Sequence, residues 1–187
     1  SMALLAGQDA LVHLAFVVLR GRMRETEMMD INVNGSHRLF QAARDAGVKR
    51  LIHLSSAAVY GQGVCVAEDA SLVPLPGFRY AEHKAQLERL LEADVPECVR
   101  LRPHVILGPH AQTLLRRLLN LPLYPALPSP YPRLQCVHED DVARAVLLAI
   151  EREVHGPFNL AAEDSFSYRE IIQRRHRVLK TGFGGVL

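Results

Sequence analysis

The chain has 187 residues, of which 49% are hydrophobic and 22% are charged, and its formal net charge is +2. These values are typical of a globular chain with a substantial core. The balanced charge argues against a dedicated nucleic-acid-binding protein, and no apolar run approaches the ~20 residues of a membrane-spanning helix. Cys65, Cys98 and Cys136 are widely spaced, which argues against a disulfide framework or a zinc site and favours a reduced, cytoplasmic setting.

Strands and helices are predicted to alternate along the chain. The apolar run from Leu11 to Val18, interrupted only by His13, predicts a strand buried on both faces. Apolar residues at steps of three and four predict a long helix over residues 24–46, with Gly47 at its end. Further strands are expected at 51–54, 98–101, 134–137 and 158–160, and further helices at 79–93, 114–119, 140–152 and from Ser167, where Glu170 completes a capping box.

Two stretches are predicted to lack regular structure. Residues 61–77 are punctuated by glycine and proline, and residues 121–132 contain five prolines. The remaining alternation of strands with helices predicts an α/β fold with a parallel sheet and crossover helices.

Tyr80 and Lys84 form the first candidate constellation. They lie four residues apart on a predicted helix and therefore share one face. A nearby ammonium lowers the pKa of a tyrosine, which makes the phenol usable as an acid or base near neutral pH. The competing interpretation is a surface pair with no role.

Ser56 is the second candidate. It lies just beyond the predicted strand 51–54, and open α/β sheets bind ligands at the carboxyl ends of their strands. A serine hydroxyl in that position can hydrogen-bond a carbonyl or alkoxide oxygen of a substrate. The competing interpretation is a serine that satisfies the end of a strand.

Seven segments, in order along the chain, together resemble the extended short-chain dehydrogenase/reductase family, also called the NAD-dependent epimerase/dehydratase family. They are Leu11-Val-His-Leu-Ala15, Ile31-Asn-Val-Asn-Gly35, Ala46-Gly-Val-Lys-Arg-Leu51, Ser55-Ser-Ala-Ala-Val-Tyr-Gly61, Tyr80-Ala-Glu-His-Lys84, Leu101-Arg-Pro103 with Gly108-Pro109, and Val137-His-Glu-Asp-Asp-Val142. The resemblance implies a Rossmann-like sheet. It also implies two regions: residues 3–110 as the catalytic half of an NAD(P)-binding domain, and residues 111–187 as a substrate-side region that adds a late strand.

The resemblance also implies a role for individual residues. Tyr80 would be the general acid/base, Lys84 would hold the nicotinamide ribose and lower the pKa of Tyr80, and Ser56 would polarise the reacting oxygen. The residues that would contact or order the cofactor are Leu14, Ala15, Phe16, Asn32, Ser55, Pro103 and His104, together with Tyr80 and Lys84. No metal is expected, because Asp141 is predicted to cap the following helix or to hold the two lobes together.

The first unit of that family is a strand, a Gly-x-x-Gly-x-x-Gly loop and a helix that grip the pyrophosphate. The sequence contains no such loop, and the segment at Leu11 lies almost at its start. We therefore expect a Rossmann-like sheet truncated in its N-terminal half, with weak or absent NAD or NADP binding by this chain alone. A homo-oligomer formed through the exposed edge between Leu11 and Val18 is also expected.

The implied activity is NAD(P)-dependent oxidoreduction or epimerisation at a secondary alcohol or ketone, in a sugar nucleotide or a similar small molecule. The stretch 121–132 holds no charged residue, which favours a smaller or more apolar substrate. The chain could be inactive alone. The alternatives are a non-catalytic binding or regulatory module, or a truncated fragment of such an enzyme.

Overall fold

A computed structural model describes residues 4–18, 21–63, 65–110, 133–167 and 170. Its centre is a parallel sheet with the strand order β1-β2-β3-β6. These strands are β1 (Ala10–His13), β2 (Arg50–Leu54), β3 (Val99–Pro103) and β6 (Gly156–Leu160). The α/β class and the parallel sheet that the sequence predicts are confirmed.

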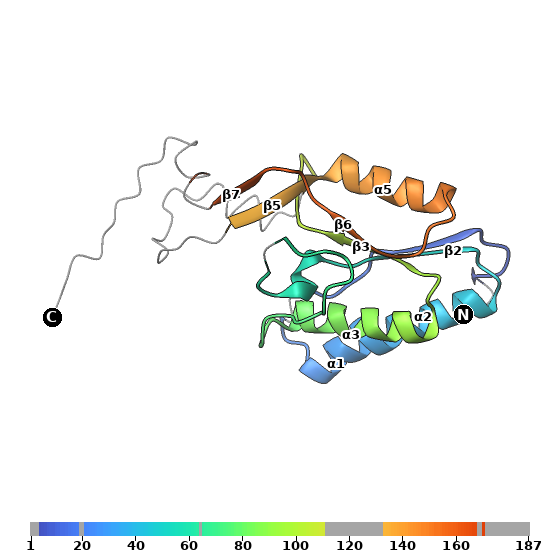
Figure 1. Cartoon of the computed structure of the whole chain (residues 1–187). Helices are drawn as coiled ribbons and strands as arrows, with labels where there is room; N and C mark the ends of the chain where they lie inside the picture. The colour runs from blue at the N-terminus through green and yellow to red at the C-terminus, as the bar shows by residue number, and fades with distance from the viewer. Residues whose placement is uncertain (1–3, 19–20, 64, 111–132, 168–169, 171–187) are drawn as a thin grey trace.

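Helices cover both faces of this sheet (Figure 1). On one face lie α1 (Glu25–Met29), the π-helical segment η2 (Asp30–Gly35), α2 (Ser36–Asp45) and α3 (Arg79–Asp94). On the other face lies α5 (Glu139–Glu151), and a short 3-10 helix, η3 (Ala57–Tyr60), follows β2. Three further strands, β4 (Val105–Leu107), β5 (Arg133–His138) and β7 (Ser165–Ser167), form a second sheet in the order β4-β5-β7.

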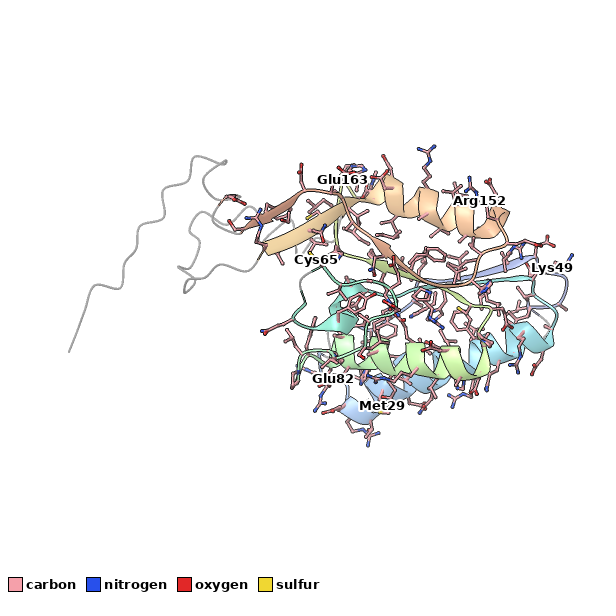
Figure 2. The ribbon with its side chains drawn as sticks, viewed as in Figure 1. Met29, Lys49, Cys65, Glu82, Arg152 and Glu163 are labelled. Atoms are coloured by element: carbon pink, nitrogen blue, oxygen red, sulfur yellow. The ribbon has the colours of Figure 1, made fainter. Side chains whose placement is uncertain are left out.

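The sheet divides the core into two layers, because successive side chains of a strand point to opposite faces. Leu51 and Cys98 pack with Phe40, Leu87 and Leu91 beneath the sheet, against α2 and α3. The neighbouring strand residues Ile52, Val99 and Leu101 point the other way. They form the second layer with Ala149 of α5. Figure 2 shows side chains filling the space between the sheet and the helices on either side.

The first strand is shorter than its apolar run predicts. It ends at His13, and Leu14 is 59% exposed. Beyond it, the backbone N–H and carbonyl of Val17 bond the side-chain amide of Asn32, at 2.7 and 2.9 Å. A side chain thus supplies the partners that a neighbouring strand would supply, so the apolar run leaves the sheet after β1.

The long helix predicted over residues 24–46 is present as three consecutive segments, α1, η2 and α2. Gly47 follows it with a φ of 79°, as predicted for a helix end. The predicted capping box is also present: the Ser167 amide donates to the Glu170 carboxylate at 2.6 Å, and the Glu170 amide donates to the Ser167 hydroxyl at 3.3 Å. The predicted helix 114–119 and the proline-rich stretch 121–132 lie outside the described residues.

The sequence patterns did not reveal β4 and β7, which have only three residues each. A strand this short cannot display a recognisable period-2 pattern. The three cysteines are free thiols, which fits their wide spacing. Within the described ranges, no helix combines the length and apolarity needed to cross a membrane.

Candidate active site

Tyr80 and Lys84 lie on the face of α3 that turns toward the sheet. Tyr80 is half-buried in the first turn of the helix, and Lys84, one turn later, is 2% exposed. Ala81 and Ala85 are fully buried on the same helix. These small residues let the helix pack closely, which carries a lysine side chain into the interior.

Ser56 meets Tyr80 at the carboxyl end of β2. Its backbone is extended, and its hydroxyl accepts a hydrogen bond at 3.2 Å from the Ala58 amide, which caps η3. A side-chain hydrogen bond also joins Ser56 to Tyr80. The predicted serine–tyrosine pair, 24 positions apart in sequence, is therefore brought together in space.

The Lys84 ammonium is enclosed by aromatic rings and backbone. It donates a hydrogen bond of 2.5 Å to the Leu54 carbonyl and lies 3.8 Å from the centre of the Phe16 ring and 5.8 Å from that of Tyr80. Burial lowers the pKa of Lys84 to about 7, because desolvation penalises the charged form. Glu88 acts in the opposite direction.

The electrostatics of Tyr80 differ from the expectation. Burial raises the pKa of Tyr80 above its usual value, and the hydrogen bond with Ser56 lowers it only in part. The expected lowering by Lys84 is not found. Two features explain this: the ammonium is directed to the Leu54 carbonyl, and with a pKa of about 7 it is only partly charged at neutral pH.

Phe16 is held in this site by Asn32. The Asn32 side chain is 1% exposed and bonds both backbone groups of Val17, next to Phe16 in the chain. It projects from η2, whose wider π-helical turn is a form of helix often found at functional sites. The Phe16 ring stands edge-on to Tyr80 at 5.7 Å. The predicted ordering role of Asn32 thus has a structural basis.

The other residues predicted to contact a cofactor are more scattered. Leu14 and Ala15 are exposed beyond β1. Pro103 is buried at the end of β3, and the His104 amide donates to the Leu160 carbonyl at 3.0 Å. Ser55 is 2% exposed and its hydroxyl donates to the Glu88 carboxylate, so it faces the interior.

Sequence patterns missed the charged residues behind the site. Arg100 and Arg102 point from β3 toward α3, where Arg102 forms a forked pair with Glu88 through contacts of 3.0, 3.0 and 2.5 Å. The sequence Val-Arg-Leu-Arg-Pro contains a usable signal. Arginines at every second position of a strand buried on both faces require a buried acidic partner.

Asp141 does not cap α5. The capping side chain belongs to His138, which accepts from the Asp140 amide at 3.3 Å, whereas Asp141 is exposed in the first helical turn. A histidine ring nitrogen is an acceptor when it carries no proton, and this property satisfies the helix end. No cluster able to hold a metal ion occurs in the parts of the chain that the structure covers.

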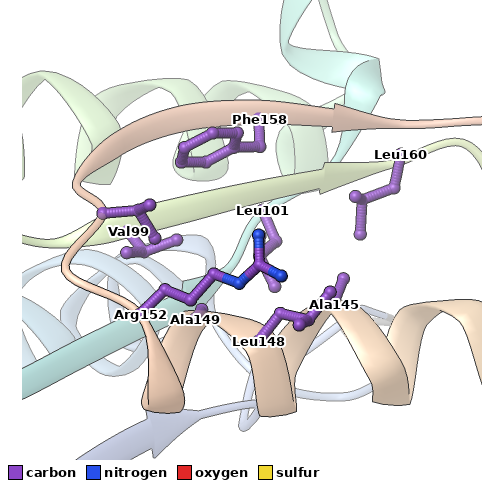
Figure 3. A pocket seen from close by; sticks show the side chains of 9 residues that line it. Val99, Leu101, Ala145, Leu148, Ala149, Arg152, Phe158 and Leu160 are labelled. Atoms are coloured by element: carbon purple, nitrogen blue, oxygen red, sulfur yellow. The ribbon is translucent and has the colours of Figure 1, made fainter.

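Two cavities adjoin the sheet. One, of about 290 Å³, is lined by His13, Ala15, Phe16, Val17, Ile31, Gly35, Ser36 and Leu39, and so borders the Phe16 side of the candidate site. The other, of about 210 Å³, lies between β3, β6 and α5 (Figure 3). Val99 and Leu101 line this second cavity from the face of β3 opposite to Arg100 and Arg102. The second cavity is therefore separated from Tyr80 by the sheet.

The buried residues fit the nicotinamide end of a dinucleotide. Lys84 is a buried donor with few hydrogen-bonding partners, the Phe16 ring offers a flat apolar surface, and Tyr80 with Ser56 presents hydroxyl groups beside them. For the pyrophosphate end, the described ranges contain no glycine-rich turn that joins a strand to a helix N-terminus.

Known proteins share this architecture. The model of the NAD dependent epimerase/dehydratase family matches residues 2–161. Sterol demethylase protein B from Methylococcus capsulatus is 31% identical over 90% of the chain. A 4-hydroxy-2-methyl-3-oxo-4-farnesyl-3,4-dihydroquinoline-1-oxide ketoreductase from Stigmatella aurantiaca is 34% identical over 62% of the chain.

A solved structure, MoeE5 in complex with UDP-glucose and NAD, superposes with a TM-score of 0.76 at 25% identity. The match covers 92% of this chain and 62% of that one. The chain spans 54% of the sterol demethylase protein and 36% of the ketoreductase. The similarity therefore extends over most of this chain but only part of each relative.

Proposed function

Because this chain belongs to the NAD dependent epimerase/dehydratase family, we propose that it acts as an NAD(P)-dependent oxidoreductase on a secondary alcohol or ketone. One observation carries the proposal. Ser56, which follows β2, meets Tyr80 and Lys84, which lie one turn apart on α3, at the carboxyl end of β2. Neither the packing of α3 nor the end of a strand requires these three side chains to meet.

Each of the three side chains has a distinct task. In the reductive direction, Tyr80 donates its hydroxyl proton to the carbonyl oxygen of the substrate, and in the oxidative direction it accepts that proton. Ser56 hydrogen-bonds the same oxygen and orients it toward Tyr80. Lys84 binds a ribose hydroxyl and, when protonated, favours the phenolate of Tyr80.

A bound dinucleotide supplies or accepts the hydride. Lys84 and Phe16 would hold its nicotinamide end, with Leu14, Ala15, Pro103 and His104 around them. We expect weak binding of NAD or NADP by this chain alone, since its sequence has no Gly-x-x-Gly-x-x-Gly loop. A fluorescence titration with NADH measures the affinity, and a micromolar or tighter dissociation constant contradicts this expectation.

We further propose that the substrate is apolar. Phe78 lies 5.7 Å from the Tyr80 ring and is 46% exposed, and Val73 and Leu75 are exposed in the preceding loop. Arg79, which precedes Tyr80 on this helix, is engaged by Glu25 and Glu82 at 2.9 and 2.7 Å. An exposed apolar rim beside the reacting group favours an apolar ketone over a sugar nucleotide. The names of the ketoreductase and the sterol demethylase protein point the same way.

The test is Tyr80→Phe, assayed with excess NADH or NADPH against sterol-like and isoprenoid ketones and, in parallel, UDP-sugars. Removal of the hydroxyl should lower kcat by about 100- to 10,000-fold, because general acid–base catalysis contributes roughly that factor. Glu92→Gln, an exposed change on the same helix, should keep the wild-type rate. Circular dichroism checks that both variants fold.

Two results would count against the proposal. Equal turnover by Tyr80→Phe and the wild type would remove Tyr80 from the chemistry. A folded wild-type chain that turns over none of these substrates would favour the alternative, a binding or regulatory module.

A further inference from the structure

Glu88 is a deeply buried carboxylate directly behind the candidate active site. Its side chain is 1% exposed, and it is the only buried acidic residue among the described ones. It follows Lys84 by one helical turn and Tyr80 by two, so the three share one face of α3. An isolated carboxylate is expensive to bury, so its partners must account for it.

Three side chains converge on Glu88, two from β3 and one from the residue that follows β2. Arg102 makes the forked contacts described above, and the Arg100 guanidinium lies 3.6 Å away. The hydroxyl of Ser55, which immediately follows β2, donates a hydrogen bond to the same carboxylate. Glu88 therefore ties α3 to the ends of both β2 and β3.

This anchoring reaches the reacting groups through the backbone. The amide of Ser55 donates to the Leu101 carbonyl at 2.7 Å, so both its amide and its hydroxyl are held. Ser56 is the next residue, so the contacts of Ser55 also fix where the backbone of Ser56 lies. Arg102 also donates a hydrogen bond of 2.5 Å to the Tyr60 hydroxyl. Tyr60 is the last residue of η3, the turn that Ser56 caps, so this contact stabilises that turn.

Glu88 is also the main source of negative charge near Lys84. The groups that approach Lys84 from the other elements are His13 on β1 and His53 on β2, with Arg100 behind His53 on β3. All are neutral or cationic, and the Lys84 ammonium lowers the pKa of both histidines further after burial has lowered it. Arg102 and Tyr80 add no negative charge at neutral pH. Among the residues that the structure describes, Glu88 is thus the one buried anion available to stabilise the ammonium.

We propose that Glu88 is a positioning residue: it orients Ser56 through Ser55 and supplies the negative charge that favours the protonated form of Lys84. The consequence for turnover rests on the proposed function above. The consequence for the ionisation of Lys84 does not, and it can be measured without any substrate or dinucleotide.

Glu88→Gln removes the charge and keeps the shape of the side chain. The chain has only three lysines, Lys49, Lys84 and Lys180, so NMR of protein labelled at lysine Cε resolves three signals, and Lys84→Met assigns one of them. Without Glu88 the ammonium is less favoured, so Lys84 should deprotonate about one pH unit lower or more. In turnover, the alkaline limb of the kcat profile should move to lower pH by the same amount.

Glu92→Gln is the matched control. Glu92 lies one turn further along α3 and approaches Arg100 at 3.8 Å, but its side chain is 70% exposed. This change should leave the Lys84 titration unaltered. An unchanged Lys84 titration in folded Glu88→Gln, or an equal shift in Glu92→Gln, would overturn the proposal.

Glu88→Asp covers the case in which Glu88→Gln does not fold. It keeps the charge but draws the carboxylate away from Ser55. The Lys84 midpoint should stay within about 0.3 pH units while kcat falls about tenfold or more, an order of magnitude typical of a misplaced catalytic group. A shifted Lys84 midpoint, or an unchanged kcat in an active chain, refutes the proposal. If no variant, including the wild type, turns over substrate, the proposed function fails but the lysine titration still decides the role of Glu88.

Discussion

Two histidines, His13 and His53, are buried side by side under the sheet. Their Nδ1 atoms lie 3.2 Å apart, and His13 Nε2 lies 3.2 Å from the Ser36 hydroxyl. Burial, assisted by Lys84, lowers the pKa of His13 to about 4, and burial lowers that of His53 well below its usual value. Both rings are therefore neutral in the folded protein near neutral pH.

These pKa values predict an acid-sensitive fold. Well above pH 6.5 neither state binds the proton, and the neutral rings make their full contribution to stability. As the pH falls from 6.5 to about 4, the unfolded chain takes up protons that the folded chain refuses, so stability is lost. His13 alone should contribute roughly 2 to 3 kcal/mol to this loss. Urea unfolding at a series of pH values measures it.

His13→Gln retains a polar contact for Ser36 but cannot titrate, so its stability should fall less steeply between pH 6.5 and 4. His155→Gln, at an exposed position, is the control and should follow the wild-type curve. Parallel curves for wild type and His13→Gln would show that His13 does not resist protonation.

The sequence was informative for residues whose chemistry depends on local spacing. Tyr80 and Lys84 follow from a helical step of four, and Ser56 follows from its place after a strand. Arg100 and Arg102 carry a local signal, since they alternate along a buried strand, but the choice of Glu88 as their partner depends on how α3 lies across β3. The raised pKa of Tyr80 was missed for a related reason, since burial depends on the whole packed site.

At the scale of elements, Gly61 links the end of η3 to the loop that returns toward α3. Its φ is 69°, and an added Cβ would collide with the backbone carbonyl of Val73. Gly47 also has a positive φ, of 79°, but no atom within 4 Å of an added Cβ. Gly47 therefore reports the cost of a positive φ without a clash, whereas Gly61, with a ψ of −117°, combines a steric clash with a backbone conformation that residues with a Cβ rarely adopt.

Gly47→Ala should cost about 1 kcal/mol of stability, as expected for a left-handed conformation. Gly61→Ala should cost about 3 kcal/mol, because the clash with the backbone adds to that penalty. Chemical unfolding of both variants provides the measurement. Equal losses would mean that the Val73 backbone moves aside freely.

Element positions were predictable where an element is long or clearly bounded. The helix ending before Gly47 and α3 follow their periodicity closely. The limits of β1 were not predictable, because an apolar run cannot show that the Asn32 side chain will replace a strand partner for Val17. The pairing of the second sheet was not predicted for a different reason. Its strands β4 and β5 pair across a wide gap in sequence, which no local pattern indicates.

At the scale of the whole molecule, β1 pairs with β2 on one side and is the edge of the described four-stranded sheet. The apolar residues along and beyond it are partly or largely open to solvent, with Leu14 at 59% and Val18 at 41% exposure. An apolar strand edge is a template for pairing with another chain. We therefore predict that this chain self-associates through β1.

Sedimentation at increasing concentration should show growth of a dimeric or larger species, and hydrogen exchange should localise it. Backbone amides of Ala10–His13 should become more protected as concentration rises, while those of the outer edge strand β6 should not change. A similar gain of protection in β6 would indicate unspecific association. A monomer at all concentrations, with fast exchange along β1, would show that the edge does not recruit a second copy.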